Sequence, residues 1–297
     1  MITSTAKRVL SGTLWTVLGR KNLVRVGRFL SNEARLDGHN DLGNNGEELV
    51  QQALLKYLPT VESPAVLDVG ANVGIWSKPL ACQLKTSGID CRQFAFEPCA
   101  ETFNTLQLNL RDWGIADRVT PQPLAVSSTT GRMTFYTLGP NQGRNGFHPP
   151  TDATPHPVKV DAITLDDWCR ARSITSVSFV KIDAEGHDME VMQGAAKLLA
   201  ERKIAMLQFE YNERWISARH YLRDAFLLLQ PHGYRLGKIT RLGVEFYSDW
   251  NFELETFREG NYLAIAPGIK VDLPEVQPWY ESIRRSGKIR RRDEQAS

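Results

Sequence analysis

Short apolar runs alternate with amphipathic segments from about residue 47 to residue 266 of the 297-residue chain. A short apolar run between turn residues predicts a buried strand, and apolar residues at helical spacing predict a helix. The predicted strands are Ala65 to Val69, Gln93 to Phe96, Val119 to Val126, Met133 to Leu138, Val177 to Ile182, Ile204 to Phe209, Tyr234 to Ile239 and Tyr262 to Ala266. Strands that alternate with helices predict an α/β fold with a mainly parallel sheet and right-handed crossovers.

The segments between these strands predict helices, turns and one long loop. The predicted helices are Glu47 to Leu58, Ile75 to Lys85, Ala100 to Arg111, Thr164 to Arg172, Met189 to Glu201 and Ala218 to Gln230. We expect residues 119–126 to pair with residues 133–138 across a turn, and the last two strands to form an edge hairpin. Residues 139–157 contain five Pro and three Gly without periodicity, which is typical of a lid or binding loop.

Both ends of the chain are basic. Residues 1 to 30 contain six Lys or Arg and no acid, with apolar residues at roughly helical spacing. We expect this helix to pack on its own domain, and contact with an anionic membrane surface stays open as the alternative. The predicted organisation is a basic amphipathic extension at residues 1–45, a catalytic domain at residues 46–270 and a basic tail at residues 271–297.

Composition favours one folded catalytic domain. Hydrophobic residues make up 42% of the chain and charged residues 24%, close to the averages of globular domains. The net charge of +2 does not indicate a nucleic-acid partner. The four cysteines form no C-x-x-C pair, and no stretch approaches the roughly 20 apolar residues that cross a bilayer. We therefore expect reduced thiols and a cytoplasmic location, with peripheral membrane contact through the N-terminal helix still open.

A glycine-rich turn follows the first predicted strand. The strand ends near Asp68, and Gly70 and Gly74 flank Asn72 before the next helix. Glycines at such a turn allow close approach of the backbone to a nucleoside ligand. A dinucleotide fingerprint would have a second glycine where Asn72 stands and a third in register. Glu97 ends the next strand, where a carboxylate can accept hydrogen bonds from ribose hydroxyls.

A second group of polar residues follows the strand at 177–182. Asp183, Glu185 and His187 come directly after this strand, and Glu210 lies at the end of the next one. The carboxyl ends of the strands in an open α/β sheet form the usual ligand-binding edge. We therefore expect these side chains to lie on the same edge as the glycine-rich turn.

The motifs now have a recognisable order. They are Asp68-Val-Gly-Ala-Asn-Val-Gly, Phe96-Glu97-Pro98, Lys181-Ile-Asp-Ala-Glu-Gly-His, Gly194-Ala195 and Glu210. Over about residues 45 to 266 the chain closely resembles FkbM-type methyltransferases, which use S-adenosylmethionine (SAM). Ala184 stands where valine is usual. The resemblance implies a Rossmann-like class I methyltransferase fold, with a mainly parallel seven-stranded sheet, helices on both faces and a C-terminal edge hairpin.

The resemblance also implies O-methylation of a hydroxyl on a sugar, glycan or natural product. We expect Asp183 and His187 to handle the proton, and Glu185 and Glu210 to orient the acceptor or one another. For the cofactor we expect Asp68 near the methionine ammonium and Glu97 at the ribose.

Further cofactor contacts are expected from Gly70, Asn72 and Gly74, and from Glu47 at the start of the first domain helix. No metal is expected, although a divalent cation held by Asp183, Glu185 and Glu210 stays open.

Three alternatives remain at this point. The first is N-methylation of a peptide side chain or amine. The second is an NAD(P)-dependent oxidoreductase built on the same sheet. The third is a non-catalytic adaptor that uses the basic ends of the chain.

Overall fold

The computed structural model describes residues 4–37, 44–149 and 152–280, and it divides into two compact units, Met1–His39 and Asn40–Ser297. The first unit contains helix α1 (Ser4–Ala34), which kinks at Gly19, where φ is +68°. Beyond the kink, helical spacing places Leu23, Val26 and Leu30 on one side of α1 and Lys21, Arg25 and Arg28 on another. Of the basic tail predicted at residues 271–297, residues 281–297 lie outside the described residues.

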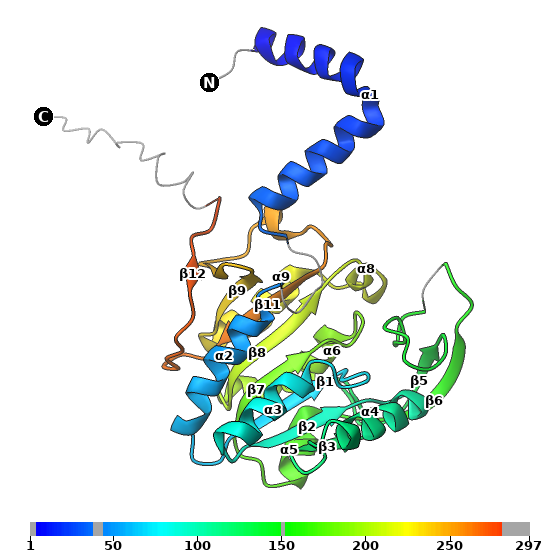
Figure 1. Cartoon of the computed structure of the whole chain (residues 1–297), viewed down its shortest axis with the longest axis vertical. Helices are drawn as coiled ribbons and strands as arrows, with labels where there is room; N and C mark the ends of the chain where they lie inside the picture. Colours follow the sequence, from blue (N-terminus) through cyan, green and yellow to red (C-terminus); the bar gives the residue numbers. More distant parts are fainter. Residues whose placement is uncertain (1–3, 38–43, 150–151, 281–297) are drawn as a thin grey trace, which may run out of the picture. The chain divides into compact units, whose positions relative to one another are not determined.

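The second unit is built on a nine-stranded sheet of described residues, in the order β12-β10-β9-β11-β8-β7-β1-β2-β3 (Figure 1). Its strands are β1 (Ala65–Val69), β2 (Arg92–Phe96), β3 (Val119–Gln122), β7 (Val177–Ile182), β8 (Ile204–Tyr211), β9 (Arg235–Thr240), β10 (Gly243–Tyr247), β11 (Gly260–Ile265) and β12 (Glu275–Val276). The neighbours from β3 to β8 pair in parallel. Strand β11 runs antiparallel to both β8 and β9.

The predicted α/β fold is confirmed, but the far edge of the sheet differs from the prediction. Strands β9 and β11 do pair, yet they form neither a hairpin nor an edge, because β11 inserts between β8 and β9. The hairpin consists instead of β9 and β10, and β12 adds a further strand at the edge. The sheet therefore has nine strands of described residues where seven were expected, and β10 and β12 are the strands at this edge that the sequence patterns did not predict.

A second, three-stranded sheet in the order β4-β6-β5 lies next in sequence to β3. It consists of β4 (Ala125–Val126), β5 (Gly131–Thr137) and β6 (His156–Ile163). The expected pairing of residues 119–126 with residues 133–138 is wrong, because β3 joins the main sheet while β5 pairs with β6. The flanking prolines hid β6, although Val158, Val160 and Ala162 alternate as a strand requires.

Helices cover both faces of the main sheet, as predicted. They are α2 (Glu47–Tyr57), α3 (Ser77–Ser87), α4 (Ala100–Asp112), α5 (Leu165–Ala171), α6 (Asp188–Gln193), α7 (Ala196–Ala200), α8 (Arg214–Ala218) and α9 (Leu222–Leu229), with single 3₁₀ turns η1 (Leu58–Thr60), η2 (Gln230–His232) and η3 (Phe252–Leu254). The helix predicted at residues 189–201 is interrupted at Gly194 and Ala195, which separate α6 from α7. A Cβ on Gly194 would lie 2.1 Å from the Ser127 carbonyl oxygen, so only glycine fits there. The helix predicted at residues 218–230 begins later, after Arg219 adopts a φ of +62°.

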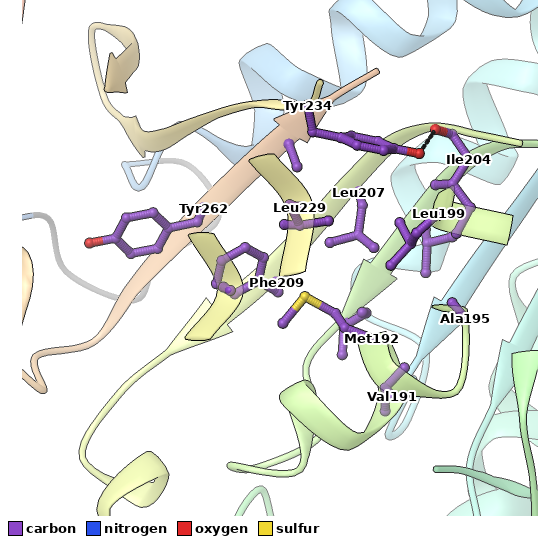
Figure 2. Close-up of a cluster of buried hydrophobic side chains, with 14 of the residues drawn as sticks. Val191, Met192, Ala195, Leu199, Ile204, Leu207, Phe209, Leu229, Tyr234 and Tyr262 are labelled. Atoms are coloured by element: carbon purple, nitrogen blue, oxygen red, sulfur yellow. Dashed lines mark hydrogen bonds between the residues drawn. The ribbon is translucent and has the colours of Figure 1, made fainter. Parts of the chain in front are cut away.

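The larger apolar core lies between β7 and β8 and the helices α6, α7 and α9 (Figure 2). Leu207 and Phe209 of β8 meet Val191 and Met192 of α6 and Leu229 of α9. The Tyr234 hydroxyl donates to the Ile204 carbonyl at 2.7 Å, so this core includes a satisfied polar group. A second core on the other face packs α2 and α3 against the same strands.

No helix among the described residues combines the length and the apolar character that a membrane span requires.

Candidate active site

A cleft lies at the carboxyl ends of the central strands. The register pairs Val69 of β1 with Phe96 of β2 and with Ile182 of β7, so the residues after these three strands emerge side by side. The cleft is lined by these strand ends, by β4 and β5, and by part of the segment between β5 and β6. This is the edge at which open α/β sheets bind ligands.

The turn after β1 brings backbone against the cleft. Gly70 has a φ of +82°, and a Cβ at this position would lie 1.8 Å from the Asp183 carbonyl oxygen. Asn72 adopts a left-handed φ of +48°, which asparagine tolerates better than most residues and which explains how it replaces a glycine. Its Oδ1 is buried and has no hydrogen-bond partner within the described part of the chain. The turn therefore offers close backbone and an unpaired acceptor to a ligand.

Glu97 follows β2 and also lines the cleft. Its Oε1 accepts a hydrogen bond from the Cys99 amide at 2.9 Å, and its Oε2 accepts one from the Asn72 amide at 3.1 Å. Burial raises the pKa of Glu97 to about 7, although both amides act in the opposite direction. Each carboxylate oxygen retains a second lone pair, so Glu97 can still accept hydrogen bonds from a ligand.

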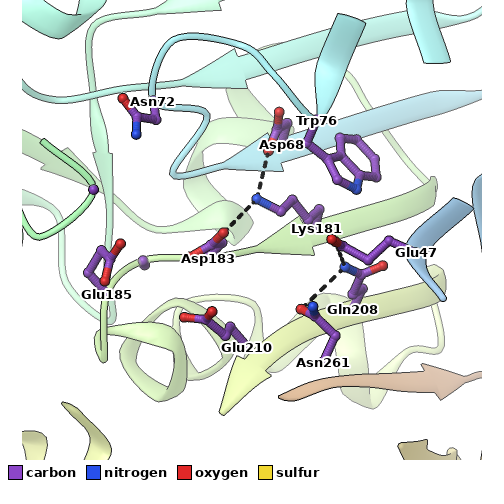
Figure 3. A network of polar contacts seen from close by, with 12 residues as sticks. Glu47, Asp68, Asn72, Trp76, Lys181, Asp183, Glu185, Gln208, Glu210 and Asn261 are labelled. Atoms are coloured by element: carbon purple, nitrogen blue, oxygen red, sulfur yellow. Dashed lines mark hydrogen bonds and ion pairs between the residues drawn. The ribbon is translucent and has the colours of Figure 1, made fainter. Parts of the chain in front are cut away.

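A buried lysine joins two aspartates beneath the cleft (Figure 3). The Lys181 Nζ lies 3.0 Å from the Asp183 Oδ2 and 3.8 Å from the Asp68 Oδ1. Burial opposes the lysine charge, but Asp183 and Asp68 outweigh it, and the pKa of Lys181 is raised. Asp183 lines the cleft with its side chain about one-third exposed, so it presents a carboxylate to a bound ligand.

Glu185 lines the cleft on the side of the β5–β6 segment. It has a φ of +57° and forms an ion pair with Arg214 of α8. Arg214 in turn donates to the Gly143 carbonyl at 3.5 Å. The β7–α6 turn is thereby tied to the segment that contributes Gln142, Gly143, Asn145 and Phe147 to the cleft.

Five of the predicted site residues are therefore on the cleft, and two of the others sit close beneath it. Gly70, Asn72, Glu97, Asp183 and Glu185 line it. Asp68 is fully buried and accepts a hydrogen bond from Ser77 Oγ at 2.7 Å, so in this structure its carboxylate does not reach the cleft. Burial raises the pKa of Asp68, and Lys181 counteracts this effect. Gly74 serves the fold instead, since a Cβ there would lie 2.8 Å from the side chain of Leu106.

The remaining three predicted residues contact other buried groups. Glu47 accepts hydrogen bonds from Gln208 and Asn45. Glu210 accepts from Asn212 at 2.6 Å, and burial together with the charge of Asp183 raises its pKa well above the usual range. Glu210 thus pairs with Asn212 and Glu185 with Arg214, and among the described residues Asp183, Glu185 and Glu210 are not grouped at the spacing of cation ligands.

His187 lies behind the cleft wall. Phe147 stacks on its ring with 4.1 Å between the centroids, and its Nε2 lies 2.9 Å from the Ser127 Oγ. Only 4% of the residue is exposed, and burial lowers the pKa of His187 to about 3. His187 immediately precedes α6, and its ring contacts Phe147 and Ser127 and does not line the cleft.

Two parts of the site were not predicted from the sequence. Lys181 belongs to one of the sequence motifs, but the sequence predicted no role in the site for it. Its pairing with Asp68 across β1 and β7 follows from the strand register. The apolar wall formed by Phe96, Leu124 and Phe135 was also missed. Its residues carry no motif, because apolar side chains in strands are usually core residues.

A comparison with protein families now identifies the domain that holds this cleft. The FkbM methyltransferase domain matches residues 68–236, more than half of the chain. The chain belongs to the FkbM methyltransferase family. The matched residues contain the β1 turn, Glu97, Lys181 and Asp183, so the family assignment covers the whole polar part of the cleft. FkbM methyltransferases use SAM, and the oxidoreductase alternative is therefore set aside.

Two curated relatives share this domain. The chain is similar to the hexuronic acid methyltransferase AglP of Haloferax volcanii, at 30% identity over 52% of this chain and 58% of that protein. It is also similar to the 2-O-methyltransferase NoeI of Sinorhizobium fredii, at 24% identity over 61% of this chain and 76% of that protein. The match thus spans less than two-thirds of the length of AglP.

Among solved structures, the cofactor-bound structure of Rv0187 from MTB matches 87% of this chain and 95% of its own, at 15% identity and a TM-score of 0.40.

Proposed function

We propose that this protein transfers a methyl group from SAM to a hydroxyl of a sugar, glycan or natural product. The observation that carries the proposal is that Gly70, Glu97 and Asp183 follow three adjacent parallel strands and line one cleft. A nucleoside-binding turn and a carboxylate able to accept a proton thus share one site. The names of AglP and NoeI, a hexuronic acid methyltransferase and a 2-O-methyltransferase, support a sugar hydroxyl as the acceptor.

The polar groups at the cofactor end of the cleft can accept the hydrogen bonds that SAM donates. Glu97 would accept hydrogen bonds from the ribose hydroxyls, and the unpaired Asn72 Oδ1 would accept from an amino group of the ligand. Gly70 lines the cleft and lets the β1 turn pass close to the Asp183 carbonyl. When bound, SAM supplies an activated methyl group on a sulfonium. Asp68 could bind the ammonium of SAM directly only if its contacts with Ser77 and Lys181 were broken. We therefore assign Asp68 the role of positioning Lys181.

The acceptor end needs a group that takes the hydroxyl proton as the oxygen attacks. We assign this role to Asp183, whose carboxylate is on the cleft and is oriented by Lys181 at 3.0 Å. Glu185 lies nearby and would orient the acceptor from its ion pair with Arg214. His187 and Glu210 were predicted to share in this chemistry, but each is buried away from the cleft lining, so the proposal gives them no direct contact with the acceptor.

Substitution of Asp183 by Asn tests the proposal. The variant keeps a side chain of the same shape, so binding of S-adenosylhomocysteine (SAH) should be retained. Transfer to a sugar hydroxyl should fall by about 100- to 10,000-fold, the usual contribution of a positioned base. Asp161→Asn, on the exposed face of β6, is the matched control. The measurement is methyl transfer from labelled SAM to a panel of uronic acid glycosides, neutral glycosides and amines.

The alternative of N-methylation predicts a different outcome. A neutral amine needs positioning but no base in contact, so an enzyme that methylates amines should keep most of its activity in the Asp183→Asn variant. Transfer to amines but to none of the hydroxyl acceptors would overturn the proposal, and so would full activity on sugars in the variant.

We also retain, as a prediction, peripheral contact of α1 with an anionic membrane surface at a cytoplasmic location. Its support is the separation of Lys21, Arg25 and Arg28 from Leu23 and its apolar neighbours along one helix.

A further inference from the structure

Three side chains converge outside the cleft, on the other side of Phe147. They are His148 from the β5–β6 segment, His187 at the end of the β7–α6 turn, and Glu190 of α6. One ligand atom from each lies within 4.8 Å of the other two. The pair formed by His187 Nδ1 and Glu190 Oε2 is 3.6 Å apart, which is too long for a good hydrogen bond.

Each of the three residues has a buried polar atom without a hydrogen-bond partner in the described structure. These atoms are His148 Nε2, His187 Nδ1 and Glu190 Oε2. Buried polar groups are nearly always hydrogen-bonded, and an orphaned group signals a missing water, a missing ion or a function. Three orphaned atoms at one place, one of them on a histidine that is 4% exposed, form a built site for a bound species.

The opposite ends of two of these side chains are anchored. His187 Nε2 lies 2.9 Å from the Ser127 Oγ, and Glu190 Oε1 lies 3.2 Å from the His220 Nε2. The tautomer that donates from Nε2 to Ser127 leaves the Nδ1 lone pair directed toward Glu190. Metal-binding histidines are commonly oriented in this way by a partner on their other ring nitrogen.

We propose that His148, His187 and Glu190 bind one divalent transition-metal ion of the Zn²⁺ class, with water completing the coordination. Two imidazoles and one carboxylate suit zinc, whereas calcium and magnesium prefer ligand sets made of oxygen. Ligands of a tetrahedral zinc ion at about 2.0–2.2 Å are roughly 3.3–3.6 Å apart. The 3.6 Å between His187 and Glu190 is already close to this spacing, and the ligand atom of His148 lies within 4.8 Å of both.

This site has a structural consequence for the cleft. His148 directly follows Phe147, which lines the cleft and stacks on His187. A metal ion would tie the middle of the β5–β6 segment to α6 and would thereby hold the cleft wall in place. The site differs from the all-carboxylate set that the sequence left open, and its ligand His148 lies in the segment predicted as a loop.

The experiment is metal titration of the untagged full-length chain after removal of bound metal. Calorimetry with Zn²⁺ and absorption spectroscopy with Co²⁺ should each give one ion per chain, with nitrogen and oxygen ligands. His148→Ala and Glu190→Gln should each weaken binding by at least about 10-fold. His156→Ala, which changes an exposed histidine at the start of β6, should bind as the parent does.

Hydrogen exchange supplies a readout that is independent of activity. Zn²⁺ should slow amide hydrogen exchange of residues 142–149 in the parent protein but not in the His148→Ala variant. Absence of saturable binding would overturn the proposal. Unchanged affinity in both ligand variants would overturn it too, and so would the thiolate-to-cobalt absorption expected if one of the four free cysteines binds the metal instead.

Discussion

The pKa of Glu97 gives the cofactor site a testable pH dependence. Burial raises this pKa to about 7 in the unliganded protein. Ribose hydroxyls donate their hydrogen bonds best to the ionised carboxylate, so cofactor binding should favour deprotonated Glu97. In the unliganded protein Glu97 is mostly protonated below pH 7 and mostly ionised above it. The affinity for the cofactor should therefore rise with pH through this range.

The magnitude follows from the ionised fraction. With a pKa of about 7, roughly one-tenth of Glu97 is ionised at pH 6 and roughly nine-tenths at pH 8. The dissociation constant of SAH should therefore fall about 10-fold between these two pH values. Binding at pH 6 should release close to one proton, whereas binding at pH 8 should release almost none.

The assay is calorimetry with SAH at pH 6, 7 and 8 and constant ionic strength. Repeating each titration in buffers of different ionisation enthalpy measures the protons released. Glu97→Gln removes the titrating group and should abolish the slope, while weakening binding at pH 8 by about 10- to 100-fold through loss of hydrogen bonds to a charged acceptor. Glu101→Gln changes an exposed glutamate in the first turn of α4 and serves as the matched control.

Two results would refute this reasoning. The first is an affinity of the parent for SAH that is constant from pH 6 to pH 8. The second is a slope that persists in Glu97→Gln, which would assign the titration to another group. The buried Asp188 is the group to examine in that case, because its pKa is also raised to about 7.

Three further predictions concern the fold and the N-terminal helix. Gly70→Ala should lower the melting temperature sharply and abolish SAH binding, because the new Cβ would meet the Asp183 carbonyl. The control Gly88→Ala, at a φ of +66° with open space around it, should lower the free energy of unfolding by only about 1 kcal/mol in thermal unfolding. Lys181→Met should destabilise the protein by about 3–5 kcal/mol in urea unfolding by leaving Asp68 buried without its cation, and adding Asp68→Asn should recover part of this loss. If α1 binds anionic membranes, Arg25→Glu should reduce flotation of the full chain with phosphatidylserine vesicles, and no flotation of the parent would contradict that contact.

Much of the fold could be predicted because its signals are local. Strand β1 was predicted with its observed bounds, and the helix predicted from Thr164 to Arg172 is α5, whose N-cap Thr164 accepts a hydrogen bond from the Asp167 amide at 3.0 Å. The errors arise where the partner is distant in sequence. The insertion of β11 between β8 and β9 is set by packing across the sheet, and the pattern of residues 260–265 alone contains no record of its neighbours.

For the polar residues of the site, too, the sequence predicts the position along the sheet edge but not the contacts with segments distant in sequence. Strand direction places Gly70, Glu97 and Asp183 on one edge of the sheet, and this much follows from the sequence pattern. Whether a side chain then reaches the cleft depends on the covering segments. Phe147 separates His187 from the cleft, and no local signal in the β5–β6 segment predicts that contact.

A row of buried polar side chains behind the cleft contains one pairing that could have been predicted from the sequence. The register aligns Asp68 of β1 with Lys181 of β7, and Lys181 with Gln208 of β8, so these three side chains lie in one row on the same face of the sheet. Glu47 of α2 covers the end of this row by accepting from Gln208. A buried lysine next to a buried aspartate is stable only as a pair, so parallel register together with side-chain alternation would assign Asp68 to Lys181 before any ligand is considered. Asp68 therefore holds Lys181, which in turn contacts Asp183 just after β7, and the ligand contacts that we propose come from the residues that follow the strand ends.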